Sequence, residues 1–414
     1  MSDYAKEHYD FPLAQKSANK PLQGLRVIDA GNMVAAPFAT VLLADFGAEV
    51  IKIEHPKQGD GQRKLDPAKN GVPLWWKSIA RNKRCITLDL GKPQGAEVFK
   101  DLVRGRDVVV ENYRPGTFER WGIGYDALRA VEARIVMLRI SGFGQTGPYK
   151  GRAGFGRVAE AMSGLVNLIG EPDGPPMSPG YPLGDLVAGV FGALSIMMAL
   201  HHRDVRGGDG QVIDLALYEA VFRLLDYDPI QYDQLKVVHQ RTGNRVAYVA
   251  PSSTFKTRDG KYVTLAASTQ NVWVRLAKAI GREDLVTNPK FIDNHARVLH
   301  SIEVNDIVGE WIERHTRDEV NRRFDECEVA YSAVFDMEDA FRDLQFRARE
   351  AMVRVPDSEI GEAVVSNVVP RFSETPGSVE FLGPAMGAHN EEVYRGELGY
   401  SKERLARLRE DGVV

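Results

Sequence analysis

Apolar residues in the first half of the chain fall into short runs that alternate with longer amphipathic stretches. Short apolar runs bounded by Gly, Pro and polar residues are typical of buried strands, and apolar positions three and four apart are typical of helices. We therefore expect strands at residues 25–30, 49–54, 85–90, 107–111, 135–141 and 211–217. We expect helices at residues 37–46, 94–104, 156–169, 185–202 and 218–225. This alternation predicts a doubly wound α/β fold with a parallel sheet.

The composition changes after this region, where residues 227–249 are polar and rich in tyrosine. We interpret this segment as a linker that leads to a smaller α/β domain at residues 250–332. A hairpin is predicted there around Asp259-Gly260, followed by helices at 272–280, 301–314 and 317–327. The first 20 residues read as a polar arm, and a charged helix is expected at 401–410.

The overall charge balance excludes some classes of partner. The chain has 414 residues, 53 basic and 57 acidic, and a formal net charge of −4. No basic footprint for nucleic acid is visible. The longest apolar run, 186–200, is shorter than the roughly 20 residues that span a bilayer, so we expect a buried helix and no membrane partner. The two cysteines are far apart and the N-terminus lacks an apolar signal core, which together favour a soluble, cytoplasmic protein.

Loops at the carboxyl ends of parallel strands form the binding edge of such sheets. Residues 31–36, 112–116 and 141–151 follow predicted strands, so we expect them near one site. The first loop matches neither the dinucleotide-binding glycine pattern nor the Walker motif, which disfavours an NAD or ATP enzyme. Asn112, Tyr113 and Arg114 offer an amide, an aromatic face and a cation suited to a nucleotide base or phosphate; the alternative is an ordinary turn.

Asp185 stands where the long apolar helix begins. A carboxylate there is either an N-cap or a nucleophile whose reaction the positive end of the helix dipole assists. His201 and His202, at the other end, point to different helix faces and have no partner motif, so no metal site is expected.

Several stretches together carry a resemblance to the class III CoA-transferases, the CaiB/BaiF family. They are residues 24–29, 42–54, 59–63, 82–84, 110–112, 142–148, 183–185 and 383–389, with Leu398-Gly399. The resemblance implies a Rossmann-like large domain, residues 1–226 plus 333–414, with the small domain carried on long linkers. It also implies an interlocked homodimer.

The resemblance also assigns roles to residues. Asp185 matches the catalytic aspartate, which forms a mixed anhydride with the donor acyl group and then an aspartyl-CoA thioester. Positions that line or flank the CoA cleft are matched by Asn112, Tyr113, Arg120, Lys92, Leu88, His55 and Met33. Arg120 and Lys92 are the expected partners of the CoA diphosphate. CoA is then a substrate, and no permanently bound cofactor is expected.

Departures from the family pattern narrow the function. Val34 stands where formyl-CoA transferases have Gln, and residues 250–254 lack their glycine run, so oxalate and formate are disfavoured. The related 2-methylacyl-CoA racemases have His-Asp where this chain has Phe155-Gly156, and Phe155 cannot move a proton. A racemase remains the alternative, as does a non-catalytic CoA-binding subunit, which Asp185 argues against.

The acids exchanged are predicted from one short stretch. Residues 155–160 resemble relatives that handle C4–C5 dicarboxylates, so we expect succinyl-CoA as donor and a small carboxylic or dicarboxylic acid as acceptor. Arg157 offers a bidentate contact to a distal carboxylate; the alternative is a surface or structural ion pair.

Overall fold

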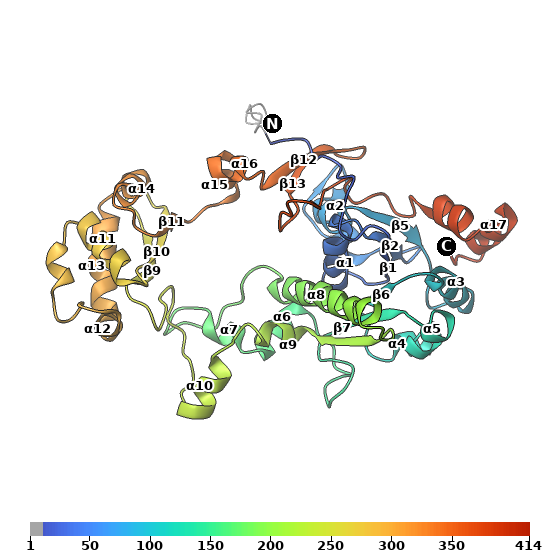
Figure 1. Cartoon of the computed structure of the whole chain (residues 1–414), viewed down its shortest axis with the longest axis horizontal. Helices are drawn as coiled ribbons and strands as arrows, with labels where there is room; N and C mark the ends of the chain where they lie inside the picture. The colour runs from blue at the N-terminus through green and yellow to red at the C-terminus, as the bar shows by residue number, and fades with distance from the viewer. Residues whose placement is uncertain (1–10) are drawn as a thin grey trace. The chain divides into compact units, whose positions relative to one another are not determined.

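The parallel sheet predicted from the apolar runs is present in the computed structural model, which describes residues 11–414 (Figure 1). It is six-stranded, in the order β5-β2-β1-β6-β7-β8, and each neighbouring pair is parallel. The strands are β1 (Arg26–Asp29), β2 (Glu49–Glu54), β5 (Lys83–Thr87), β6 (Val108–Glu111), β7 (Val136–Ser141) and β8 (Val212–Ala216). The direction of winding reverses between β1 and β6, which makes their carboxyl ends the switch point where ligands bind in such sheets.

Successive residues of a strand point to opposite faces of the sheet, so the apolar strands give it two apolar faces. Helices cover both of them. In β1, Val27 joins one apolar cluster and Ile28 joins the other. The Val27 face carries α1 (Ala35–Asp45), α6 (Gly156–Met162), α8 (Leu183–Val205) and α9 (Leu217–Phe222). The Ile28 face carries α3 (Pro93–Val103), α5 (Tyr125–Val131) and the C-terminal η4 (Glu392–Glu397) and α17 (Lys402–Glu410). The doubly wound α/β prediction is confirmed.

The chain divides into two compact units. The first holds the described residues up to 165 together with 179–229 and 344–414, and the second holds 166–178 and 230–343. The expected role of residues 227–249 as a linker stays a prediction; the structure has helix α10 (Asp228–Leu235) within them.

The second unit has an antiparallel sheet of β9 (Ser252–Lys256), β10 (Tyr262–Ala266) and β11 (Tyr331–Ala333), in the order β11-β10-β9. Around this sheet the second unit has α11 (Gln270–Ala279), η3 (Glu283–Val286), α12 (Asn294–Leu299), α13 (Ser301–Glu313), α14 (Arg317–Glu326) and α15 (Met337–Arg342), besides most of α7 (Leu165–Leu168) and α10. Trp273 and Phe324 lie fully buried in its core. The predicted hairpin around Asp259-Gly260 is confirmed.

Several boundaries differ from the sequence-based expectation. Helix α1 begins at Ala35, two residues before Pro37. The predicted helix 156–169 is two helices, α6 and α7 (Leu165–Leu168), because Gly164 adopts a left-handed φ of 95°. The hairpin of β12 (Met352–Asp357) and β13 (Gly361–Ser366) was not predicted from its mixed sequence. The remaining short elements are η2 (Gly61–Lys64), β3 (Ala68–Lys69), β4 (Val72–Pro73), α2 (Leu74–Ile79), α4 (Thr117–Arg120) and α16 (Leu344–Ala348).

Helix α8 is long and apolar enough to cross a membrane by length and composition, and it is one face of the core in this structure. Two glycines allow its close packing. A Cβ on Gly189 would lie 2.8 Å from Phe38 of α1, and a Cβ on Gly192 would lie 2.8 Å from Leu138 of β7. The helix therefore packs against the sheet as an element of the core, and this packing fixes where its N-terminus lies.

Candidate active site

A cavity of about 300 Å³ lies at the carboxyl ends of β1, β6 and β7, beside the first turn of α8. Its polar lining comes from the loops after these strands and from the helix. These residues are Asn32, Asn112, Tyr113, Arg114, Ser141 and Asp185, with Met33 beside them. As predicted, residues from the loops that follow three different strands line one site.

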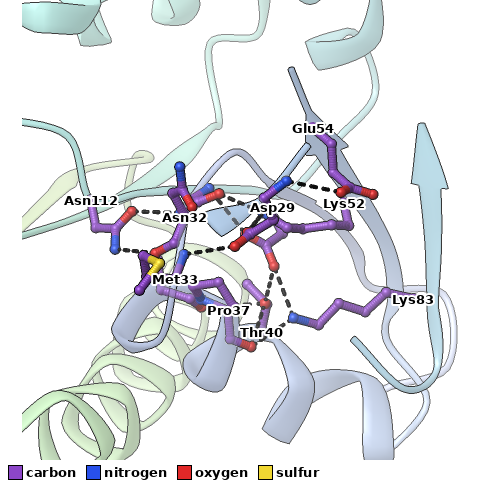
Figure 2. A network of polar contacts seen from close by, with 12 residues as sticks. Asp29, Asn32, Met33, Pro37, Thr40, Lys52, Glu54, Lys83 and Asn112 are labelled. Carbon is purple, nitrogen blue, oxygen red and sulfur yellow. Dashed lines mark hydrogen bonds and ion pairs between the residues drawn. The ribbon is translucent and has the colours of Figure 1, made fainter. Parts of the chain in front are cut away.

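The loops after β1 and β6 are tied together by a pair of hydrogen bonds. The backbone N–H of Asn32 donates to Oδ1 of Asn112, and Nδ2 of Asn112 donates to the carbonyl of Asn32, each at 2.8 Å (Figure 2). Met33 follows in the left-handed region, with φ of 65°, and its N–H donates to Asp60 at 3.0 Å. The oxygen and the nitrogen of the Asn112 amide thus both take part in shaping the cavity wall.

Beneath the first loop lies a buried ionic cluster whose members Asp29, Lys52 and Lys83 are shown in Figure 2. Its fourth member is the buried Asp60. Nζ of Lys83 is 2.9 Å from Asp29, and Nζ of Lys52 is 2.9 Å from Asp60. Burial alone raises the pKa of Asp29, but the two lysines outweigh it and hold that pKa at about 2.

Both lysines of this cluster also donate to backbone carbonyls, Lys52 to Gly31 in the loop and Lys83 to Pro37 in the first turn of α1. A buried cation that lost these partners would be strongly unfavourable, so the cluster holds the loop in one conformation. The loop conformation that lines the cavity therefore depends on charges that lie behind it.

A second buried carboxylate shapes the loop after β6. Oε2 of Glu111 accepts the N–H of Tyr113 at 2.6 Å, and its other oxygen accepts from Arg139 at 2.7 Å. Burial raises the pKa of Glu111 to about 7, although Arg139 opposes the shift. These contacts fix the backbone that carries Tyr113 and Arg114 into the cavity wall.

Asp185 is the third residue of α8 and does not cap it. The N-cap position is Pro182, with no side-chain cap bond, so the N-cap interpretation of Asp185 is wrong. Burial and then the negative charge of Glu160 raise the pKa of Asp185 to about 6, while a hydrogen bond from the Gly156 backbone opposes the shift. The side chain is a partly desolvated carboxylate held in the first turn of a helix, where its ionised form is favoured by the dipole.

Gly156 makes room for that carboxylate. A Cβ at residue 156 would lie 2.2 Å from Oδ2 of Asp185, far inside van der Waals contact. Phe155, directly before it, lines the cavity and is 71% exposed. The pair that distinguishes this chain from its expected relatives therefore places a glycine directly against the carboxylate.

Glu160 is a neighbour of Asp185 that the sequence did not single out as a partner. It lies on α6, is 2% exposed, and its Oε1 accepts the N–H of Gly184 at 2.8 Å. The bond holds the residue immediately before Asp185. The spacing of α6 and α8 in the sequence carries no signal for this contact, which arises from packing between the two helices.

The cavity gathers Met33, Asn112, Tyr113 and Asp185 among the predicted site residues. Leu88 is 1% exposed in the apolar core. Nε2 of His55 lies 3.6 Å from Asp89.

The two expected diphosphate partners lie outside the cavity lining. Lys92 donates to the carbonyls of Asp411 and Gly412, and Arg120 donates to Oγ1 of Thr117 at 2.9 Å. The assigned roles of these residues toward CoA stay predictions.

Arg157 lies on the exposed side of α6 and makes no hydrogen bond or ion pair within residues 11–414. Arg114 and Ser141 do line the cavity, although neither was assigned a role in the reaction. The sequence feature that could have identified both is their position, because each stands at or just after the carboxyl end of a predicted strand. Within the described residues no group of three His, Cys, Asp or Glu side chains is placed to hold a metal ion.

Comparisons with known proteins agree with this geometry. The family model for CoA-transferase family III matches residues 22–390. The succinyl-CoA–D-citramalate CoA-transferase of Chloroflexus aurantiacus is 41% identical over 95% of this chain and 98% of its own. The succinyl-CoA–L-malate CoA-transferase beta subunit of that organism is 42% identical over the same shares.

A solved structure gives the same result for the fold. The crystal structure of a CaiB/BaiF family protein from Brucella suis superposes with a TM-score of 0.81, at 30% identity, over 92% of this chain and all of that one. With the cavity at the switch point and a carboxylate at the head of α8, the chain is a member of CoA-transferase family III, an enzyme that transfers coenzyme A between carboxylic acids.

Proposed function

We propose that this enzyme takes succinyl-CoA as donor, passes CoA to a small dicarboxylic acid, and does so through Asp185. The two Chloroflexus relatives are named for succinyl-CoA with D-citramalate or L-malate, and these names support this substrate class. The observation that carries the proposal is Asp185 itself, a carboxylate that lines a cavity at the switch point with its pKa raised to about 6.

The proposed chemistry divides one exchange into steps of similar kind. An Asp185 oxygen attacks the thioester carbon of the donor, and the CoA thiolate leaves with the C–S electron pair, which gives a mixed anhydride. The thiolate then attacks the Asp185 carbonyl, releases the donor acid and leaves an aspartyl-CoA thioester. The acceptor acid reverses both steps. At neutral pH a carboxylate with a pKa near 6 is largely ionised and remains a better nucleophile than an ordinary aspartate.

Binding of CoA is assigned to the residues around this cavity and to those along the edge of the sheet beside it. Met33, Asn112 and Tyr113 support this assignment as cavity-lining residues. His55, Leu88, Lys92 and Arg120 are proposed on family resemblance. Arg120 is the better of the two cations for the diphosphate, because Lys92 already donates to two carbonyls.

Recognition of the distal carboxylate of the acid is proposed for Arg157, which is exposed on the helix whose first residue contacts Asp185. Arg157→Gln should raise KM for a dicarboxylate several-fold and leave KM for a monocarboxylate unchanged. Arg114→Gln is the comparison, because Arg114 lines the cavity. If only the Arg114 variant shows the selective increase, the assignment moves to Arg114.

The assembly is proposed to be a homodimer, and the location the cytoplasm. A stripe of exposed apolar residues on α8, Val190, Leu194, Met197 and Met198, supports a partner on this face. The free thiols of Cys85 and Cys327 suit a reducing compartment.

Trapping the intermediates tests the role of Asp185. The enzyme is incubated with succinyl-CoA, quenched with hydroxylamine or borohydride, and digested for mass spectrometry. Modification at residue 185 is expected, and Asp185→Ala should lose exchange by several orders of magnitude while it still binds CoA. Turnover that survives this substitution would rule out the covalent mechanism. Epimerisation of a 2-methylacyl-CoA without any acid partner would instead assign a racemase.

A further inference from the structure

Asn32 has a side-chain amide nitrogen that the protein leaves unused at the wall of the active-site cavity. The residue is half-buried and lines the same cavity as Asp185. Its Oδ1 accepts the backbone N–H of Gly61 at 2.9 Å, whereas its Nδ2 makes no hydrogen bond within residues 11–414. That nitrogen is not one of the fully buried unpaired atoms of this part of the chain, so it keeps surface that a ligand can reach.

The direction of this amide is fixed by its surroundings. The backbone N–H of Gly61 can only donate, so the oxygen of the Asn32 amide faces it and the nitrogen points away from it. The backbone of Asn32 is held as well, because its N–H and its carbonyl both bond to the side chain of Asn112 at 2.8 Å (Figure 2). The free N–H groups therefore belong to a residue that three hydrogen bonds keep in place.

The size of the cavity indicates which part of a substrate meets this amide. Its volume of about 300 Å³ is at the lower end of the range for small-molecule sites, which runs to about 1,000 Å³. The space suits a small acyl group with its thioester better than it suits a whole acyl-CoA. Because Asp185 attacks that thioester in the proposed function, the cavity that Asn32 shares with Asp185 holds the reacting atoms.

We infer that Nδ2 of Asn32 donates a hydrogen bond to the acyl oxygen of the group that reacts with Asp185. The inference rests on the proposed function and adds a second catalytic residue to it. As an Asp185 oxygen bonds to the thioester carbon, the C=O electron pair moves onto the acyl oxygen. The Asn32 N–H stabilises that negative charge and keeps its proton. When the C=O reforms, the C–S pair leaves with the CoA thiolate.

Arg114 and Tyr113 also line the cavity and also have donors to offer. Arg114 is exposed and carries a full charge, which suits the distal carboxylate of an acid. The ring of Tyr113 packs against Phe118 and Trp121, with centroids 5.7 and 5.0 Å away, but no hydrogen bond within the described chain orients its hydroxyl. Of the three, Asn32 is the neutral donor whose direction is already fixed, and a donor fixed in advance is the kind that stabilises a developing oxyanion.

Two substitutions of Asn32 test the inference in the full-length enzyme, with succinyl-CoA as donor, at a pH well above 6 where Asp185 is ionised. Asn32→Ala removes the amide donors without adding a charge. The single-turnover rate at which residue 185 is acylated should fall about 10²-fold, as expected for loss of one oxyanion donor. Asn32→Asp keeps an oxygen for the Gly61 N–H, loses both donors and adds a repelling charge, so its rate should fall at least as far.

Asn288→Asp is the matched control and should be acylated at the normal rate. Asn288 is also half-buried, its Oδ1 accepts the backbone N–H of Lys290 at 3.0 Å, and it lies outside the lining of the cavity. A normal acylation rate in both Asn32 variants would overturn the inference. A normal rate in Asn32→Ala together with a loss in Tyr113→Phe would instead assign the donor to Tyr113.

A vibrational measurement separates this role from a structural one. Succinyl-CoA with an isotopic label at the thioester carbonyl is bound to Asp185→Ala, which cannot be acylated, and its C=O stretch is recorded by infrared difference spectroscopy. Losing a donor raises that stretch, so the variant with both Asp185→Ala and Asn32→Ala should show it at higher frequency. An unchanged frequency would overturn the inference even if the rate had fallen. If Asp185→Ala still exchanges CoA normally, the proposed function fails, and the frequency still decides whether Asn32 contacts the acyl oxygen.

Discussion

At the scale of single residues, the site is built on a carboxylate kept in an unfavourable place. Asp185 loses solvation in the cavity wall and faces the charge of Glu160, and the N–H of Gly156 only partly compensates. Both effects disfavour the ionised form, so the pKa rises while the side chain remains reactive. The surroundings that destabilise the ionised carboxylate of Asp185 also make it more basic, and therefore a usable nucleophile near neutral pH.

The pH dependence of exchange follows from that shift. Attack requires the ionised form, so kcat/KM should be constant well above pH 6 and fall about tenfold per unit below it. Glu160→Gln removes the neighbouring charge and keeps an oxygen that can accept the Gly184 N–H, so its midpoint should move to lower pH. Initial rates over pH 4.5 to 8.5 check both profiles. A midpoint unchanged by the substitution would show that Glu160 does not set this pKa.

The sequence identified some residues of the site and missed others, as Asp185, Glu160 and Ser141 show. Asp185 was found because it stands at the start of a long apolar run within a family motif. Glu160 was not found as its partner, since a contact between two helices leaves no trace in the spacing of either. Ser141 ended a correctly predicted strand, but only the structure shows that its hydroxyl has no protein partner in the described chain.

At the scale of elements, the first turns of α6 and α8 pack against each other around the carboxylate of Asp185. Gly156 opens α6 and lies against the carboxylate in the first turn of α8, and Glu160, one turn later, bonds the backbone before it. A side chain at residue 156 is incompatible with this approach. Gly156 is therefore sterically matched to the position that the Asp185 carboxylate takes in this chain.

Gly156→Ala should consequently lower kcat by about 10²-fold or more, because its Cβ would lie 2.2 Å from Oδ2 of Asp185 and displace the nucleophile. Circular dichroism and Tm should show that the enzyme still folds. Gly396→Ala is the control, since a Cβ there meets no heavy atom within 4 Å. Normal turnover of the Gly156 variant would mean that the carboxylate reacts from another position.

Element boundaries were predicted well where apolar patterns were strong and poorly where they were not. The bounds of β2 match the prediction, since it is an uninterrupted strand between turns. The start of α8 was displaced by two residues, because Pro182 rather than Asp185 takes the N-cap position. Lys52 and Lys83 sit inside buried strands, where apolar residues are the rule, and their ionic cluster follows only from the parallel pairing of the sheet.

At the scale of the whole molecule, one apolar face of α8 is left exposed by the packing of the described chain. Gly189, Gly192 and Ile196 lie against the sheet side, while Leu194 and Met198 are 48% and 61% exposed. A regular stripe of exposed apolar residues on a core helix marks an interaction surface. The homodimer inherited from the family resemblance is the partner proposed for it.

Charges placed on this stripe should prevent assembly. Leu194→Glu with Met198→Glu is expected to give chains with the mass of a monomer, or chains that fail to accumulate in soluble form, because two buried carboxylates would remain unpaired. Light scattering after size exclusion measures the mass. Leu299→Glu, on an exposed leucine of α12, is the control and should leave the mass unchanged. A dimer that persists in the double variant would exclude this face from the interface.

The cavity wall separates into two kinds of residue with different freedom to change. Asn32, Met33 and Asn112 are anchored by hydrogen bonds to each other's loops and to the buried Asp60, so altering them disturbs the scaffold. Val34, Phe155 and Leu217 face the same space through apolar side chains alone. Divergence toward new acids, by natural drift or in a directed library, therefore has a short list of positions at which pocket shape can vary while the nucleophile and its support stay intact.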